Sequence, residues 1–362
     1  MGEREKKNEK QVNIETLKLP SEQNEAQAGS FSVTALNPLV LTTARYEPGR
    51  ASHYLCSLDD SQKRLIGAAE LAYYQGKPDE AVAIARKLDE GSIDSCFAKT
   101  LISVMAALSM GNINDIFQSY FELSNAIGID ASNPSLIKTG DFMRLFFNIM
   151  IHNIKGIHFP QVSVYAFAVS ESLKPMAIYS YAHYLQLCGD SGRAVGLAEG
   201  ALVMMEHTCP ISEIYLALII AIGYISRRMW EKAEYYFRYA WSLAEPDSII
   251  MPFAEYRGLL TGLLEKCLRY DNPEVYRSIL ELANRYHKNW IYIHNEITGD
   301  TVTDKLTAIE FNIAMLASRD YSNIEIASHL DISVNSVRAH LRNIFNKLGV
   351  DSRKQLGKFV IK

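Results

Sequence analysis

Apolar residues recur at intervals of three and four along most of this chain, from about residue 55 to residue 287. This spacing places them on one face of an α-helix, whereas a half-buried strand needs an apolar residue at every second position. The stretch SVYAFAVS at 163–170 is the one segment that also fits a strand. Because 48% of the 362 residues are hydrophobic, the chain can bury a sizeable core. We therefore predict an all-α protein of two or three domains.

Within the helical region, a helix–turn–helix pattern recurs at 69–88, 106–123, 181–202 and 216–240. In three copies the first helix ends at a glycine, as expected for a left-handed C-cap, and in three copies an alanine lies five residues beyond the turn. The glycines are Gly76, Gly111 and Gly189, and the alanines are Ala81, Ala194 and Ala233, with Ile116 at the same position of the second copy. A small residue there allows the paired helices to approach closely.

These segments resemble the tetratricopeptide repeat, a helical pair of about 34 residues. The copy at 216–240 fits best, and 130–172 does not fit. The residues of that copy at the family's preferred spacing are Ala221, Tyr224, Ala233, Phe237 and Ala240. The resemblance implies that helix pairs stack into a curved solenoid, whose concave surface suits a peptide, small-molecule or protein effector. An irregular all-helical domain is the alternative.

Composition divides the chain into four segments. Residues 1–50 are predicted to be disordered, because the first thirty are rich in Glu, Lys, Asn and Gln and nearly free of aromatic residues. Residues 51–290 form the helical repeat domain, 291–302 form a linker, and 303–362 form a separate C-terminal domain.

Charge, cysteines and hydropathy limit the class of protein. A net charge of −4 means that any nucleic-acid binding must come from a local basic surface. The five cysteines form no CxxC pair, which indicates buried thiols in a reducing cytoplasm and no metal site.

The most apolar stretch, Ile214 to Ile225, is shorter than the roughly 20 residues that cross a membrane. It is predicted to be the core helix of a soluble protein.

The last sixty residues contain three helix-start signals in close succession. The signals are Thr307 with Glu310, Ser322 with Glu325, and Ser333. The first two are capping boxes, in which side chains three residues apart satisfy backbone donors at a helix start. A tight turn at Asp331–Ile332 leads into the third helix, 333–348, and Gly349 ends it. Two helices joined by a tight turn form the helix-turn-helix of DNA-binding proteins.

The third predicted helix is basic on its outer face. It carries Arg338, Arg342 and Lys347 and has no acidic residue. Such a face on an acidic protein suits the phosphate backbone of DNA. Taken alone, the same pattern also fits the solvated face of an ordinary helix.

The spacing of the whole segment resembles the LuxR-type helix-turn-helix without a gap. The matching residues are Leu306, Thr307, Glu310, Leu316, Ser322, Asn323, Glu325, Ile326, Ala327, Leu330, Ile332, Ser333, Val337, His340, Asn343, Ile344, Lys347, Leu348, Gly349, Val350 and Arg353. The resemblance covers about a sixth of the chain. It departs from the family at Ile309, where arginine is usual, and at Asp320, where glycine is usual, so a slightly different turn is expected at Asp320.

The resemblance also implies roles for individual residues. Arg338, Ala339 and Arg342 are expected to face base edges in the major groove, where arginine bonds guanine in bidentate fashion. Phosphate contacts, which position the protein without reading sequence, are expected from Ser322, Asn323, Asn335, Ser336 and Lys347. His340 is expected to pack within the domain.

The sequence therefore predicts a cytoplasmic regulator that binds double-stranded DNA as a homodimer. The segment after Val350 is expected to form a fourth helix, 351–361, which supports dimerisation in the family. The short linker predicts that the helical domain contacts the C-terminal domain and masks its recognition helix.

No P-loop, HExxH or GxSxG pattern is present, so no enzyme activity, cofactor or metal is expected. The alternative function is a helical-repeat interaction scaffold with a vestigial DNA-binding domain.

Overall fold

The computed structural model describes residues 37–89, 92–129, 133–155, 157, 169–260, 262–301, 305–330 and 332–360. Helices and short turns make up these residues, with no strand among them. The predicted all-α class is therefore confirmed. The possible strand at 163–170 lies almost entirely outside the described residues, as do residues 1–36 of the predicted disordered segment.

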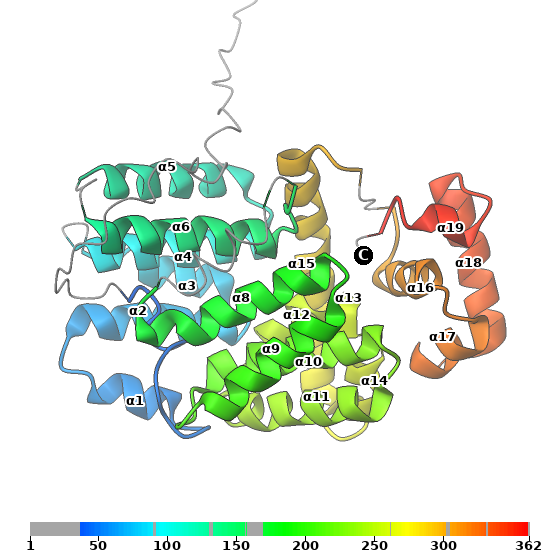
Figure 1. The fold of residues 1–362 in the computed structure, drawn as a ribbon, viewed down its shortest axis with the longest axis horizontal. Helices are drawn as coiled ribbons and strands as arrows, with labels where there is room; N and C mark the ends of the chain where they lie inside the picture. Colours follow the sequence, from blue (N-terminus) through cyan, green and yellow to red (C-terminus); the bar gives the residue numbers. More distant parts are fainter. Residues whose placement is uncertain are drawn as a thin grey trace, which may run out of the picture.

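A large helical domain, residues 37–301, carries a small C-terminal domain, residues 305–360, on one side (Figure 1). The helical domain consists of α1 (Ala51–Ser57), α2 (Ser61–Tyr74), α3 (Pro78–Ala85), α4 (Ile93–Met110), α5 (Ile113–Ile129), α6 (Pro134–Met150), η3 (Glu171–Leu173), α8 (Lys174–Leu187), α9 (Ser191–Met204), α10 (Pro210–Ser226), α11 (Trp230–Ala244), η4 (Glu245–Asp247), α12 (Met251–Glu255), α13 (Arg257–Leu260), α14 (Leu263–Leu268) and α15 (Pro273–Thr298). The C-terminal domain consists of α16 (Ala308–Ser318), α17 (Asn323–Leu330), α18 (Val334–Leu348) and α19 (Arg353–Leu356).

The four predicted repeats correspond to packed helix pairs: α2 with α3, α4 with α5, α8 with α9, and α10 with α11. Gly76, Gly111 and Gly189 adopt the left-handed backbone conformation expected at the turns. The small-residue positions are fully buried, at Ala81, Ala194, Ala233 and also Ile116. The helix pairs are thus present, whereas their assignment to the tetratricopeptide family stays a prediction.

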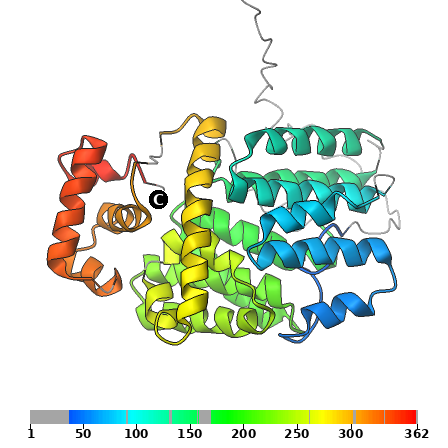
Figure 2. The same cartoon turned by 180° about the vertical axis from the view of Figure 1, so that it is seen from behind.

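Two helices form the centre of the helical domain. Every residue of α10 from Pro210 to Ile225 is buried, which confirms the core helix predicted from the apolar run. The longest helix, α15, lies on the side of the helical domain that faces the C-terminal domain (Figure 2). Its buried residues lie on one face at helical spacing: Ile279, Leu282, Ala283, Tyr286, Trp290, Ile291, Ile293, His294 and Ile297.

The packed part of the chain begins before the predicted boundary at residue 51. Leu41 is fully buried, and its backbone N–H donates to the carboxylate of Glu70 at 2.7 Å. Thr42 donates to the same carboxylate from its backbone N–H (3.0 Å) and its hydroxyl (2.6 Å). Further along, the Tyr46 N–H donates to the Thr208 carbonyl at 3.3 Å and the Gly49 N–H to Asp247 at 2.7 Å. Residues 37–50 are therefore tied to the helical domain, and the predicted disorder of 1–50 is wrong for this part.

Two boundaries near the C-terminus also differ from the prediction. The segment predicted as a linker, 291–302, is helical as far as Thr298, because the apolar face of α15 continues through Ile293 and Ile297. The fourth helix, predicted over 351–361, is shorter: α19 ends at Leu356 and turns follow as far as residue 360. Leu356 and Val360 are nonetheless buried against the domain core.

The burial of the cysteines differs from expectation. Cys209 and Cys267 are buried, but Cys56 and Cys188 are exposed and Cys96 is half-buried. All five are free thiols, so the predicted burial holds for two of them.

By length and composition alone, α4 could cross a membrane, with a mean hydropathy of 1.4 over 18 residues. However, 67% of it is buried inside the protein, where α3, α5 and α15 pack on it. Burial of this kind is typical of a core helix.

Candidate nucleic-acid interface

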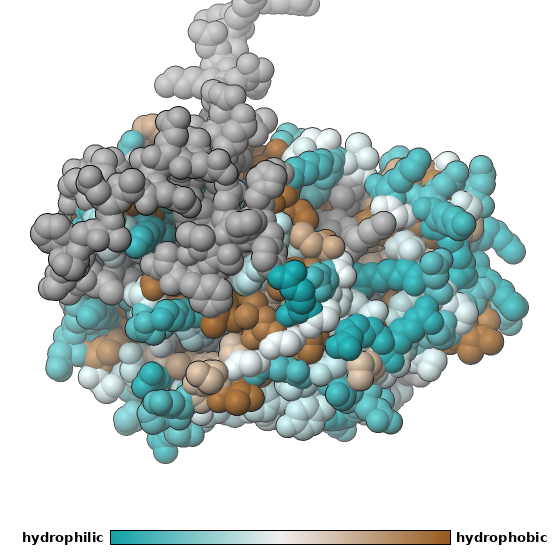
Figure 3. Space-filling model, in the orientation of Figure 1, coloured by the Kyte–Doolittle hydropathy of each residue, from teal (hydrophilic) through white to brown (hydrophobic). Residues whose placement is uncertain are grey.

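The outer face of α18 presents the residues predicted to read bases. Arg338, Ala339 and Arg342 are exposed, while Val337, Leu341 and Ile344 are buried on the opposite face. Arg338 and Arg342 are four residues apart, so they lie on the same side of the helix, one turn from each other. The surface of the C-terminal domain, at the right in Figure 3, is largely hydrophilic.

The start of α18 is fixed by its own side chains. The hydroxyl of Ser333 accepts the backbone N–H of Ser336 at 3.0 Å, as predicted for a helix cap. Asn335 is exposed and accepts from Arg338 Nη1 at 3.3 Å, and Ser336 is half-buried. At the other end Gly349 adopts the predicted left-handed conformation. Asp331, in the turn before α18, lies outside the described residues.

Both predicted capping boxes are present. Thr307 and Glu310 bond reciprocally at the start of α16. At the start of α17 the Ser322 backbone N–H donates to Glu325 at 2.7 Å, and the Glu325 N–H donates to the Ser322 hydroxyl at 3.2 Å. Ser322 is exposed and Asn323 half-buried.

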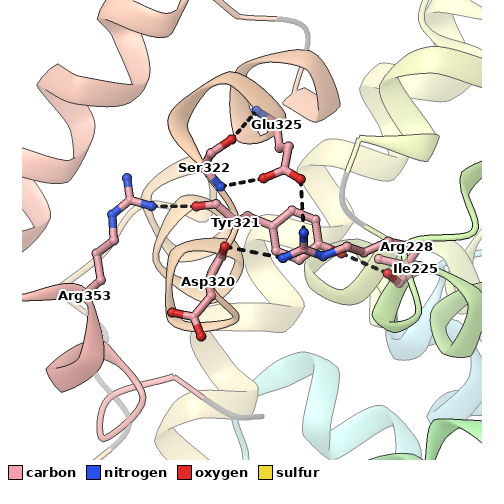
Figure 4. A network of polar contacts seen from close by, with 7 residues as sticks. All are labelled: Ile225, Arg228, Asp320, Tyr321, Ser322, Glu325 and Arg353. Carbon is pink, nitrogen blue, oxygen red and sulfur yellow. Dashed lines mark hydrogen bonds and ion pairs between the residues drawn. The ribbon is translucent and has the colours of Figure 1, made fainter.

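Two residues link the helices of this domain. Lys347, predicted to contact phosphate, donates from Nζ to the buried carboxylate of Glu310 at 2.6 Å and so joins α18 to α16. Arg353 donates to the backbone carbonyl of Tyr321 at 2.5 Å (Figure 4). It also donates to the side chain of Asn323. The sequence indicated Arg353 only as a family match, because its partners are distant in the chain.

Asp320, at the position where glycine is usual, has φ of 61°. This left-handed conformation is the one that glycine adopts freely, and among other residues Asp and Asn tolerate it best. The turn therefore keeps a glycine-like backbone.

The C-terminal domain docks on the helical domain through α16 and α17. Arg228, in the turn between α10 and α11, pairs with Glu325 at 3.2 Å and stacks over the Tyr321 ring (Figure 4). The Tyr321 hydroxyl donates to the Ile225 carbonyl at 2.9 Å. Because the docking uses these helices, the outer face of α18 remains exposed, and the predicted masking of that face is wrong.

A second set of contacts in the docking interface brings His329 close to Trp230 and Gly262. The rings of Trp230 and His329 lie with centroids 3.4 Å apart. At Gly262, where φ is +78°, a Cβ atom would lie 1.4 Å from the His329 carbonyl oxygen, so only glycine fits. Neither Trp230 nor Gly262 carries a sequence signal of docking, because their partners are distant in sequence.

Residues 304–360 match the family model described as bacterial regulatory proteins, luxR family. Residues 304–360 are a LuxR-family helix-turn-helix domain.

Curated relatives of the chain are described as HTH-type transcriptional regulator MalT. The protein of Yersinia pestis (strain Pestoides F) is 31% identical over 88 residues, and that of Cronobacter sakazakii (strain ATCC BAA-894) is 35% identical over 87. Each match covers 21% of this chain and 10% of the relative. No solved structure matches the chain significantly. The likeness to the LuxR family is therefore shown for residues 304–360.

Proposed function

We propose that this protein is a cytoplasmic regulator that reads the major groove of double-stranded DNA with α18, and that its helical domain binds an effector. The observation that supports the proposal most directly is the exposed Arg338–Ala339–Arg342 face on a helix that has no acidic residue. The two guanidinium groups are the proposed base readers, and Ala339 leaves room for a thymine methyl.

The proposed phosphate contacts are Ser322, Asn323, Asn335, Ser336 and Lys347. Four of them lie at the starts of α17 and α18, where the positive end of the helix dipole favours an anion. Lys347 is the weakest member of the set, because it reaches a phosphate only by sharing or leaving the Glu310 carboxylate.

We also propose that two chains bind together, because one domain offers few contacts. Analogous helix-turn-helix proteins read two half-sites as dimers. The helical domain contributes no catalytic step in this proposal; it is the part that responds to an effector.

The test is genome-wide binding by the intact protein and by Arg338→Ala/Arg342→Ala. We expect discrete promoter peaks that disappear in the double variant, because losing each bidentate contact reduces binding by about 1–3 kcal/mol. A matched control is Arg50→Ala/Arg285→Ala, which removes the same charge from exposed positions of the helical domain and should leave the peaks unchanged.

With the operator in hand, binding should weaken steeply as salt rises, since phosphate contacts release counterions, and should depend on protein concentration as expected for a dimer. If the intact protein gives no peaks and shifts no DNA at low salt, the proposed function fails and the scaffold alternative is favoured.

A further inference from the structure

A cavity of about 60 Å³ lies where α16 of the LuxR-type domain packs on the helical domain. Its walls are mostly aromatic and apolar: Tyr286 and Trp290 come from α15, and Phe311 and Met315 come from α16. A smaller cavity of about 20 Å³ adjoins it and shares Phe311, Gly258 and His287. The site is thus built by both domains.

The wall of the cavity includes buried imidazole atoms without a hydrogen-bond partner among the described residues, and His183 carries one of them. His183 is only 1% exposed, and its Nδ1 lies 3.2 Å from the Tyr256 hydroxyl. Its Nε2 has no hydrogen-bond partner among the described residues. A buried polar atom left in this state destabilises the fold, and such atoms are rare in folded proteins. Whatever occupies the cavity is therefore expected to bond to His183.

Two further imidazoles line the same space. His152 Nδ1 and His287 Nε2 are also buried without a hydrogen-bond partner among the described residues. No group of three side chains suited to a metal ion is found in the described part of the chain.

The lining carries little charge. Burial lowers the pKa of His183 to about 3, and burial with the nearby Arg257 lowers the pKa of His287 to about 4. Arg257 itself is paired with Glu265 at 3.4 Å. Burial raises the pKa of Glu255 to about 7, and its carboxyl accepts from the Tyr73 and Tyr215 hydroxyls. Neutral imidazoles and aromatic rings favour an uncharged ligand.

We propose that this cavity is an effector site for a small uncharged molecule with an aromatic body and one hydrogen-bonding group, which bonds to His183. The proposal rests on the proposed function, because it assigns the effector class of the same regulator.

The volume of the cavity indicates how a bound ligand would change the position of the DNA-binding domain. Its present volume suits a few waters, whereas an engineered apolar cavity that binds benzene measures about 150 Å³. A ring-sized ligand therefore requires the flexible side chains of Met150 and Met315 to shift or α16 to move outward. Because α16 belongs to the LuxR-type domain, its movement would change how that domain is held.

The test uses the full chain with two probes, phenol and benzene, and measures binding by titration calorimetry. The probes differ by a single hydroxyl, so we expect phenol to bind about tenfold more tightly, which is the effect of one satisfied hydrogen bond. His183→Phe keeps a ring but removes Nε2, and it should abolish this preference.

A second variant keeps the test sound if His183→Phe fails to fold. Gly258 lines both cavities, and a Cβ there would meet Phe311 and Asn312 at an ordinary 3.6 Å. Gly258→Leu should therefore fill the space and reduce phenol affinity at least tenfold. The matched control is Gly196→Leu on α9, where nothing lies within 4 Å of a Cβ.

Absence of phenol binding, or equal binding by Gly258→Leu and Gly196→Leu, would overturn the effector site while leaving DNA binding by Arg338 and Arg342 intact. Phenol binding to a chain that binds no DNA would instead support the site and refute the proposed function.

Discussion

Asp320 shows how a single residue can depart from a family pattern without changing the backbone. It occupies the usual glycine position before α17 and takes the left-handed conformation itself, with φ of 61°. Its carbonyl oxygen also accepts from Arg228 Nη2 at 3.4 Å (Figure 4). The expected altered turn is thus replaced by a glycine-like turn that carries an aspartate.

We predict that Asp320→Ala lowers the free energy of unfolding by about 1 kcal/mol, because alanine meets the full steric penalty of the left-handed region. Asp320→Gly should be at least as stable as the natural chain. Both variants lose the carboxylate, so urea denaturation of the pair isolates the backbone effect. Equal stability of the two variants would contradict the explanation.

At the scale of helices, the contact between Lys347 and Glu310 holds α18 on α16. Glu310 is 4% exposed and also accepts from the backbone N–H and hydroxyl of Thr307. Burial alone would raise the pKa of Glu310, but Lys347 and Thr307 outweigh it and hold this pKa below its ordinary value. The stabilisation from Glu310 is therefore present above its unfolded pKa and is lost as pH falls through the lowered one.

We predict that Lys347→Met lowers the free energy of unfolding by about 2 kcal/mol at pH 7, because a buried carboxylate loses a charged partner. The loss should shrink at pH 4, where the carboxyl of the variant is protonated. Chemical denaturation at both pH values measures this loss of unfolding free energy. Lys358→Met, at an exposed position of the same domain, is the control and should change stability little. A loss that is the same at pH 4 and pH 7 would argue against the ion pair.

At the scale of the whole molecule, His329 links the docking of the two domains to pH. Burial lowers its pKa to about 4; Arg228 and Lys266 act in the same direction and Glu325 opposes them. Since the docked imidazole resists protonation, the stability from docking is complete above the ordinary pKa of about 6.5 and is lost as pH falls from there toward 4.

We predict that the natural chain loses more unfolding free energy between pH 7 and pH 5 than His329→Phe, which keeps a ring against Trp230 but cannot titrate. The lowered pKa values of His183 and His287 also reduce the stability of the fold as pH falls. The pKa values of Glu70 and Glu255 are raised to about 7, so these two groups increase the stability as pH falls. These groups are common to both chains and cancel in the comparison. His207→Phe, at an exposed position, should follow the natural chain, and parallel curves for all three would exclude the link.

Local signals in the sequence were sufficient for the helical class and for the helix ends that carry a cap. The capping boxes at Thr307 and Ser322, the cap at Ser333 and the left-handed glycines at the turns all follow from chemistry within a few residues. The exposed arginines of α18 follow from the 3.6-residue period, which assigns buried and exposed faces without knowledge of other helices.

The sequence by itself thus determined the all-helical class, the helix-turn-helix and the face that α18 presents. Only the tertiary structure decided that α15 continues to Thr298, that Arg228 and Trp230 hold the LuxR-type domain, and that the His183 cavity lies between the domains. The physical reason is separation along the chain. Caps and periodicity act within one or two helical turns, whereas the Arg228–Glu325 and Trp230–His329 contacts join residues about a hundred positions apart, which no local pattern encodes.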